Sequence, residues 1–82
     1  MARRTDRHSS LMRISEAARA VGISKQTIEY YIMLGLISPI RPEGKRTRYF
    51  DRALVQRIRL IHRLNRSGYT LRDIRETYLR NR

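Results

Sequence analysis

The chain has 82 residues, and its nineteen lysines and arginines against seven aspartates and glutamates give a formal net charge of +12 at pH 7. A chain this short forms one domain and buries only about 60% of the surface that its unfolded form exposes, which argues against a deep substrate cavity. So cationic a surface repels itself unless a polyanion lies nearby, so nucleic acid is the first partner to expect, well ahead of an acidic membrane.

The chain contains no cysteine. This excludes disulfides, thiolate metal sites and thiol redox sensors, and it fits a reducing cytoplasm. No apolar run is long enough to span a bilayer, and no apolar segment of a secretory signal follows the basic start. We therefore expect a cytoplasmic, nucleoid-associated protein. Because His8 and His62 are the only histidines, we expect no metal site, and we expect no cofactor.

Residues 1–12 carry Arg3, Arg4 and Arg7 beside Ser9 and Ser10 and offer little to bury. We predict a flexible basic arm there, with the folded domain occupying residues 13–82. A basic arm can enter a minor groove or follow phosphates. A disordered tail without a function fits the composition equally well.

A first short helix is expected after Ser15, whose side chain would cap it, with Glu16 placed favourably in the helix dipole. Ala17, Ala18 and Val21 form its apolar stripe, and Gly22 should end it.

A second helix should begin at the cap Ser24, bury Ile28 and either Tyr31 or Ile32, and end at Gly35. Two short helices joined by a glycine-containing turn are typical of a helix-turn-helix, whose second helix enters the major groove of DNA.

The second helix has a polar face opposite its apolar one, because Gln26, Glu29, Tyr30 and Met33 follow the spacing i, i+3, i+4, i+7. Glutamine pairs with adenine, glutamate accepts a hydrogen bond from the cytosine amino group, and lysine reaches guanine or phosphate. The alternative is an ordinary solvated face, which carries most weight for Glu29, because a carboxylate beside DNA lowers affinity unless it finds a donor. The candidates for base reading are Lys25, Gln26, Thr27, Glu29 and Tyr30.

Residues 36–40 are apolar, residues 48–50 alternate in polarity, and residues 42–45, with Pro42 and Gly44, supply a turn between them. This pattern predicts a short two-stranded hairpin, the wing of a winged helix. Its cations should contact phosphates, since guanidinium groups match phosphate oxygens; a solvated basic turn is the alternative. These cations are Arg41, Lys45, Arg46 and Arg48.

Asp51 should cap a third helix with an apolar stripe at helical spacing, and Gly68 should end that helix. Thr70 with Asp73 then marks the start of a fourth helix bearing Leu71 and Ile74. The fold class predicted is therefore mainly α, a winged helix-turn-helix of about four helices with a short two-stranded wing. The stripe of the third helix consists of Leu54, Val55, Ile58, Ile61 and Leu64.

Residues 12–76 resemble the DNA-binding domain of the MerR family of transcriptional regulators. The run ISEAARAVGISKQTIEYYIMLGLI is similar to the family's first two helices, with TIEYY at residues 27–31 in place of its Thr, apolar, Arg, Tyr, Tyr signature. Residues 47–51 resemble the Tyr, Arg, variable, Tyr, Asp run of its wing, and residues 63–74 resemble its second wing and the next helix. Two departures leave the base contacts open, because Glu29 replaces a usual arginine and Ile32 a usual acidic residue.

The resemblance implies a transcriptional regulator that binds pseudo-palindromic promoter DNA as a homodimer and distorts it so that RNA polymerase can engage. Family regulators continue into a long dimerisation helix and a sensing domain, which we expect to be absent here. The chain is then either an excised domain or a small member that dimerises weakly, assembles on DNA or uses a partner. Together with the wing, the resemblance gives as phosphate-contact candidates Ser24, Tyr31, Arg41, Lys45, Arg46, Arg48, Arg66 and Tyr69.

Four other functions remain to be considered. Catalysis is set aside, because no acid–base pair, phosphate-cradling glycine loop or serine elbow is present. An excisionase-like or architectural protein would use the same fold to bend DNA at directly repeated sites. A protein-interaction module would present Tyr30 and Met33 to another polypeptide. RNA is the weakest candidate, because the A-form major groove does not admit a helix.

Overall fold

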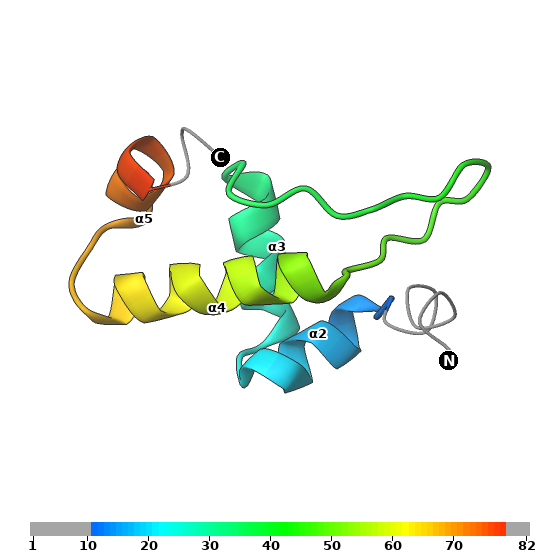
Figure 1. Ribbon diagram of the computed structural model, residues 1–82, viewed down its shortest axis with the longest axis horizontal. Helices are drawn as coiled ribbons and strands as arrows, with labels where there is room; N and C mark the ends of the chain where they lie inside the picture. Colours follow the sequence, from blue (N-terminus) through cyan, green and yellow to red (C-terminus); the bar gives the residue numbers. More distant parts are fainter. Residues whose placement is uncertain (1–10, 79–82) are drawn as a thin grey trace, which may run out of the picture.

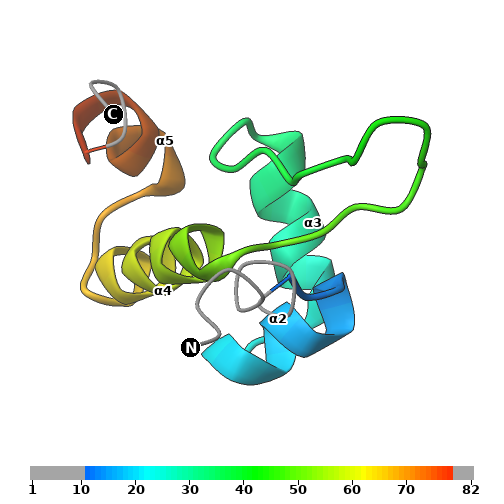
Figure 2. The ribbon, with the colours of Figure 1, turned by 45° about the vertical axis from the view of Figure 1, so that its right-hand side comes forward.

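The computed structural model describes residues 11–78 of the chain. Helices α2 (Ile14–Val21), α3 (Lys25–Met33) and α4 (Arg52–Arg66) are followed by α5 (Leu71–Asp73), which continues into one π-helical segment, η1 (Ile74–Tyr78). Figures 1 and 2 show α3 crossing α4, with a long loop between them that projects away from the helices. In both views this loop and the connection from α4 to α5 lie at opposite ends of α4, with α3 between them. Within residues 11–78, no helix is long and apolar enough to span a lipid bilayer.

Helix α2 begins two residues earlier than the predicted cap at Ser15 would allow, at Ile14 instead of Glu16. Its N-cap is Arg13, whose backbone N–H donates to Glu16 Oε1 at 3.0 Å. Two backbone hydrogen bonds between Met12 and Phe50, at 2.9 and 2.8 Å, hold the chain extended up to that point. The helix therefore starts at Ile14, and Glu16 rather than Ser15 takes part in its capping by accepting the N–H of the cap residue Arg13. The predicted arm over residues 1–12 lies outside the described residues up to residue 10, whereas Met12 belongs to the folded part.

The limits of α3 are the predicted ones. Ser24 Oγ accepts the backbone N–H of Thr27 at 3.1 Å, which caps the helix. At the other end, Gly35 has a φ of +78°, a conformation that glycine adopts without the strain of a side chain. The helix buries Ile28 and Tyr31 against α2 and α4, which completes the predicted helix-turn-helix.

The wing is a hairpin-shaped loop closed by a single residue pair, and the predicted pair of strands is not formed. Ile40 and Tyr49 exchange two backbone hydrogen bonds of 2.8 Å, and the tip turns at Pro42–Lys45, where Lys45 N–H donates to the Pro42 carbonyl at 3.0 Å. The next hydrogen-bonded pair of an antiparallel ladder would join residues 42 and 47. Pro42 has no N–H to donate there, so the ladder stops after one pair.

Helix α4 contributes one side of the hydrophobic core. Val55, Ile58 and Ile61 are buried as predicted, and Leu54 and Leu64 are partly buried beside them. Asp51 Oδ1 accepts the Leu54 N–H at 2.9 Å and caps the helix as predicted. The buried set also includes Ala17, Ala18, Ile28, Tyr31, Leu36, Ile37, Phe50 and Ile74.

Three arginine side chains donate hydrogen bonds to backbone carbonyl groups of neighbouring segments, a role that the sequence pattern did not indicate. Arg59 of α4 donates to the Ala20 carbonyl in the last turn of α2 at 2.9 Å, and Arg75 of η1 donates to the Leu34 carbonyl at the end of α3 at 3.0 Å. Arg57 Nε donates to the Leu36 carbonyl at 3.1 Å. Carbonyl groups at helix ends lack partners within the helix and carry partial negative charge, so these contacts fix the helices relative to one another.

The fourth predicted helix exists but is short and changes form. Thr70 Oγ1 accepts the Asp73 N–H at 3.0 Å, the predicted cap, and Ile74 is fully buried. After Asp73 the chain continues as the π-helical segment η1, which lies against α4.

Replacing Ile58 with alanine tests this core. The side chain is fully buried, so the variant should lose about 2 to 5 kcal/mol of unfolding free energy through the cavity left behind. Gln56 is exposed on the same helix, and Gln56→Ala should stay within about 0.5 kcal/mol of the parent chain. Urea unfolding followed by circular dichroism measures both, and equal losses would show that α4 does not pack as described.

Candidate nucleic-acid interface

The outer face of α3 carries four of the five predicted base-reading side chains in exposed positions, namely Lys25, Gln26, Glu29 and Tyr30. Thr27, the fifth, is half-buried, and its hydroxyl lies 2.9 Å from that of the cap residue Ser24. Exposed apolar groups continue this face, because Tyr30 is 49% exposed and Met33 is 71% exposed. Tyr30 also lines a hollow of about 400 Å³ that extends to α5 and η1.

Glu29 does not project alone from this face. Arg48 of the wing donates two hydrogen bonds to its carboxylate, from Nη1 to Oε1 at 3.0 Å and from Nη2 to Oε2 at 2.7 Å. This fork is the charge-assisted, bidentate arrangement in which arginine binds carboxylates most strongly. The wing and α3 are therefore joined across nineteen residues of sequence, at the side chain that faces outward from the middle of α3.

The pair also fixes the charge state of both groups. The Arg48 hydrogen bond lowers the pKa of Glu29 below its ordinary value of 4.5, with smaller help from the charges of Arg48 and Lys25. In return the hydrogen bond to Glu29 raises the pKa of Arg48 above its ordinary value. Glu29 is thus a carboxylate, an acceptor only, at neutral pH.

The four cations predicted for the wing are not equivalent. Arg41, Lys45 and Arg46 are exposed around the turn at Pro42–Lys45. Arg48 is half-buried and paired with Glu29. The wing therefore presents three side chains to a polyanion directly and holds the fourth against α3.

Tyr31 lies in the core, with 2% of the residue exposed, and burial raises the pKa of its phenol. No hydrogen bond joins its hydroxyl to another described residue, and among the residues described no fully enclosed side-chain oxygen lacks a partner. Tyr31 is therefore a core residue, and a phosphate contact could involve only its hydroxyl.

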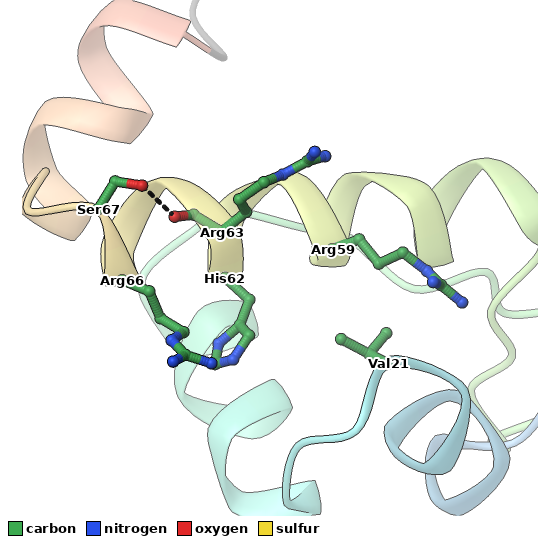
Figure 3. Close-up of a pocket in the computed structure, with 6 residues that line it drawn as sticks. All are labelled: Val21, Arg59, His62, Arg63, Arg66 and Ser67. Carbon is green, nitrogen blue, oxygen red and sulfur yellow. Dashed lines mark hydrogen bonds between the residues drawn. The ribbon is translucent and has the colours of Figure 1, made fainter.

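A second cationic surface lies at the end of α4 and beside the α2–α3 turn. It surrounds a hollow of about 620 Å³, in which His62 and Arg66 point the same way and Val21 lies opposite (Figure 3). Arg59 lines the hollow but is already bonded to the Ala20 carbonyl. Beyond the hollow, exposed Tyr69 receives a hydrogen bond on its backbone carbonyl from Asn65 at 2.8 Å.

The sequence reasoning named Arg66 and Tyr69 at this end of the molecule and missed His62 and Arg63, which also line the hollow. Their spacing gave the signal. Residues 59, 62, 63 and 66 follow the steps i, i+3, i+4, i+7 and so share one side of a helix. Within residues 11–78, no group of three histidine or acidic side chains comes together that could hold a metal ion.

The Glu29–Arg48 pair can be tested by titration. Arg48→Ala should raise the pKa of the Glu29 carboxyl towards 4.5, because the largest cause of its lowering is removed. The pKa of Glu29 is lower in the folded state, so the pair's contribution to stability is complete above the unfolded pKa and is lost as the pH falls through the folded one. Carboxyl NMR shifts recorded against pH measure this, with Arg46→Ala as the matched control. An unchanged Glu29 pKa in Arg48→Ala would mean that the pair does not form in solution.

Two curated proteins are similar to this chain in sequence. The mercuric resistance operon regulatory protein of Bacillus cereus is 41% identical over 66 residues, which cover 76% of this chain and 47% of that protein. The HTH-type transcriptional regulator CueR of Bacillus subtilis is 36% identical over 64 residues, which cover 78% of this chain and 44% of that protein. The chain thus spans less than half the length of these curated relatives.

A solved structure has the same fold. The crystal structure of HiNmlR, described as a MerR family regulator lacking the sensor domain and bound to promoter DNA, matches with a TM-score of 0.73 and 30% identity over 80% of this chain and 50% of that one. The sequence profile of the MerR HTH family of regulatory proteins matches residues 12–80. These matches confirm the predicted resemblance and the fold class, and the family is one of regulators and not of enzymes. The chain belongs to the MerR family of helix-turn-helix regulatory proteins.

Proposed function

We propose that this chain binds double-stranded promoter DNA as a transcriptional regulator, with α3 in the major groove. The observation that carries the proposal is the exposed face of α3 between two cationic surfaces, the wing at one end of α4 and the hollow at the other. Phosphate contacts around a helix in the groove fix its register and orientation on the duplex. The MerR family regulator HiNmlR, which lacks the sensor domain, is described as bound to promoter DNA and supports this mode.

The side chains divide into two classes under this proposal. On the outer face of α3, Lys25, Gln26, Glu29 and Tyr30 would reach base edges, while Thr27 stays bonded to Ser24 at the helix start. The phosphate contacts lie around this face and fix the register. They comprise Ser24, the Tyr31 hydroxyl, Arg41, Lys45, Arg46, Arg66 and Tyr69, with His62 and Arg63 beside Arg66.

The assembly is also part of the proposal. Two copies would bind the two halves of a pseudo-palindromic promoter element, as a dimer in solution or by assembling on the DNA, in the bacterial cytoplasm. Regulation would follow from how the bound pair shapes the DNA for RNA polymerase.

Selection of binding sites from a random duplex library tests the proposal. A two-fold symmetric motif is the expected result, with affinity that falls steeply as salt rises. Directly repeated or single half-sites would favour an architectural protein, and no enriched motif would contradict sequence-specific regulation.

The wing contacts predict a defined change in the salt dependence. Lys45→Ala and Arg46→Ala should each weaken binding to selected and scrambled DNA alike and reduce the slope of log K against log salt by about 1. Glu43→Ala, in the same turn, removes a negative charge and serves as the control, which should bind at least as tightly as the parent. Titrations by fluorescence anisotropy at several salt concentrations measure the slopes, and an unchanged slope for both cation variants would exclude the wing from the interface.

Tyr31→Phe tests the hydroxyl alone. Because Tyr31 Oη has no hydrogen-bond partner among the described residues, its removal should leave unfolding free energy within about 0.5 kcal/mol of the parent. DNA affinity should fall several-fold for every sequence, as expected when one neutral phosphate contact is lost. Equal DNA affinity of Tyr31→Phe and the parent chain would exclude the Tyr31 hydroxyl from the phosphate contacts.

A further inference from the structure

We propose that Arg48 is a positioning residue for base recognition, which holds the Glu29 carboxylate so that it accepts a hydrogen bond from a cytosine amino group. This inference rests on the proposed function and deepens it. It also reassigns Arg48, which the sequence placed among sequence-independent phosphate contacts, to the reading of one base pair in each half-site.

The placement of Glu29 is the first step. It lies in the second turn of α3, on the same outer face as Gln26 and Tyr30, and half of its side chain is exposed. A helix in the major groove uses the residues of its first turns to reach base edges. Glu29 is therefore placed to meet a base in any docking that brings Gln26 to one.

An acidic side chain at this place needs a reason in a chain of net charge +12. An isolated carboxylate would repel the phosphates on both sides of the groove. The guanidinium of Arg48 cancels that repulsion locally through hydrogen bonds of 3.0 and 2.7 Å. What remains for the DNA is a directional acceptor with little net charge.

The hydrogen-bond count leaves this acceptor free to act. The fork occupies one lone pair on each Glu29 oxygen and two of the five N–H groups of Arg48, so each oxygen can still accept one bond. In the major groove, cytosine presents the N4 amino donor and thymine and guanine present acceptors at the corresponding edge. A carboxylate that only accepts therefore favours cytosine, with adenine N6 as its nearest competitor.

Arg48 is the more covered partner, since 26% of its side chain is exposed against 49% for Glu29. The wing thus supports the carboxylate from the side while Glu29 faces outward. So exposed an ion pair adds little to folding stability. Its effect is geometric, because a fork fixes both oxygens of a side chain that would otherwise sample many rotamers, and a prearranged contact loses less entropy on binding.

The test compares base preference among matched variants of the 82-residue chain. Binding sites are selected for the parent, Glu29→Gln, Arg48→Lys, Arg48→Ala and Arg46→Ala, after circular dichroism shows that each is folded. The parent should prefer cytosine at one position of each half-site, and replacing that base should weaken binding on the order of tenfold. Glu29→Gln should shift the preference at that position to adenine, since glutamine both donates and accepts.

The arginine variants decide the role of Arg48. Arg48→Lys keeps the charge without the fork, so it and Arg48→Ala should both flatten the preference at the Glu29 position and leave the other positions unchanged. Arg46→Ala should weaken all sites uniformly and retain the cytosine preference.

Three results would overturn the inference. A uniform loss of affinity in the Arg48 variants, with cytosine still preferred, would make Arg48 an ordinary phosphate contact. A parent motif that no Glu29 or Arg48 variant alters would remove both residues from base reading and leave the proposed function standing. A parent that enriches no motif would end the inference and the proposed function together.

Discussion

The apolar stripe of α4 is the constraint on which the rest of this structure depends. Val55, Ile58 and Ile61 are buried along one side of a single fifteen-residue helix, and α2, α3 and η1 pack on or near that side. A domain this small buries a modest fraction of its surface, so it has no second core to position its outer parts. The orientation of α3, and with it the face that we propose to meet DNA, follows from how Ile28 and Tyr31 fit into the same buried cluster.

Arginine has two physical roles in this chain, and the composition alone does not separate them. Some guanidinium groups close carbonyls between elements, as Arg59 does at Ala20 and Arg75 at Leu34. Others, such as Arg41 and Arg46, are exposed in the wing, with no ion pair among the described residues. The count of nineteen lysines and arginines therefore overstates the number of cations that are free to contact a polyanion. Part of the positive charge serves the fold, because planar guanidinium groups with several donors suit the partial negative charge of helix ends.

Helix caps, helix-ending glycines and hydrophobic periodicity, which depend on neighbouring residues in the sequence, predicted most of the fold. Ser24, Asp51 and Thr70 cap their helices as predicted, Gly22 and Gly35 end theirs, and the buried positions of α4 follow its periodicity. The two failures had different causes, a pairing partner distant in sequence in one case and a local proline in the other. The Met12–Phe50 pairing moved the start of α2 away from Ser15, and the missing N–H of Pro42 limited the wing to one pair.

The candidate site divides in the same way. Helical spacing was enough to place Gln26, Glu29 and Tyr30 on one exposed face, because this arrangement depends on α3 alone. The partnership of Glu29 with Arg48 depends on how the wing folds back over α3, and no periodicity reports that. The burial of Tyr31 is likewise a product of packing against neighbouring elements.

The Glu29–Arg48 pair should reduce the contribution of Arg48 to the salt-dependent affinity for DNA. Each phosphate contact contributes to the salt slope, about 0.9 per neutralised phosphate on duplex DNA, and a cation held by a carboxylate no longer contributes its full share. An arginine at position 29, the usual residue of the family, would add a positive charge where this chain has a negative one. Under the proposed mode of binding, the chain thus gives up non-specific attraction at the centre of the outer face of α3. Exposed cations on the wing and at the end of α4 can supply that attraction from the sides, where it carries no base information. Under the proposed mode of binding, a carboxylate held in a fork at this position lowers the affinity for DNA in general. The loss is smaller for DNA that places a hydrogen-bond donor opposite the carboxylate. This difference in affinity is what makes the contact specific.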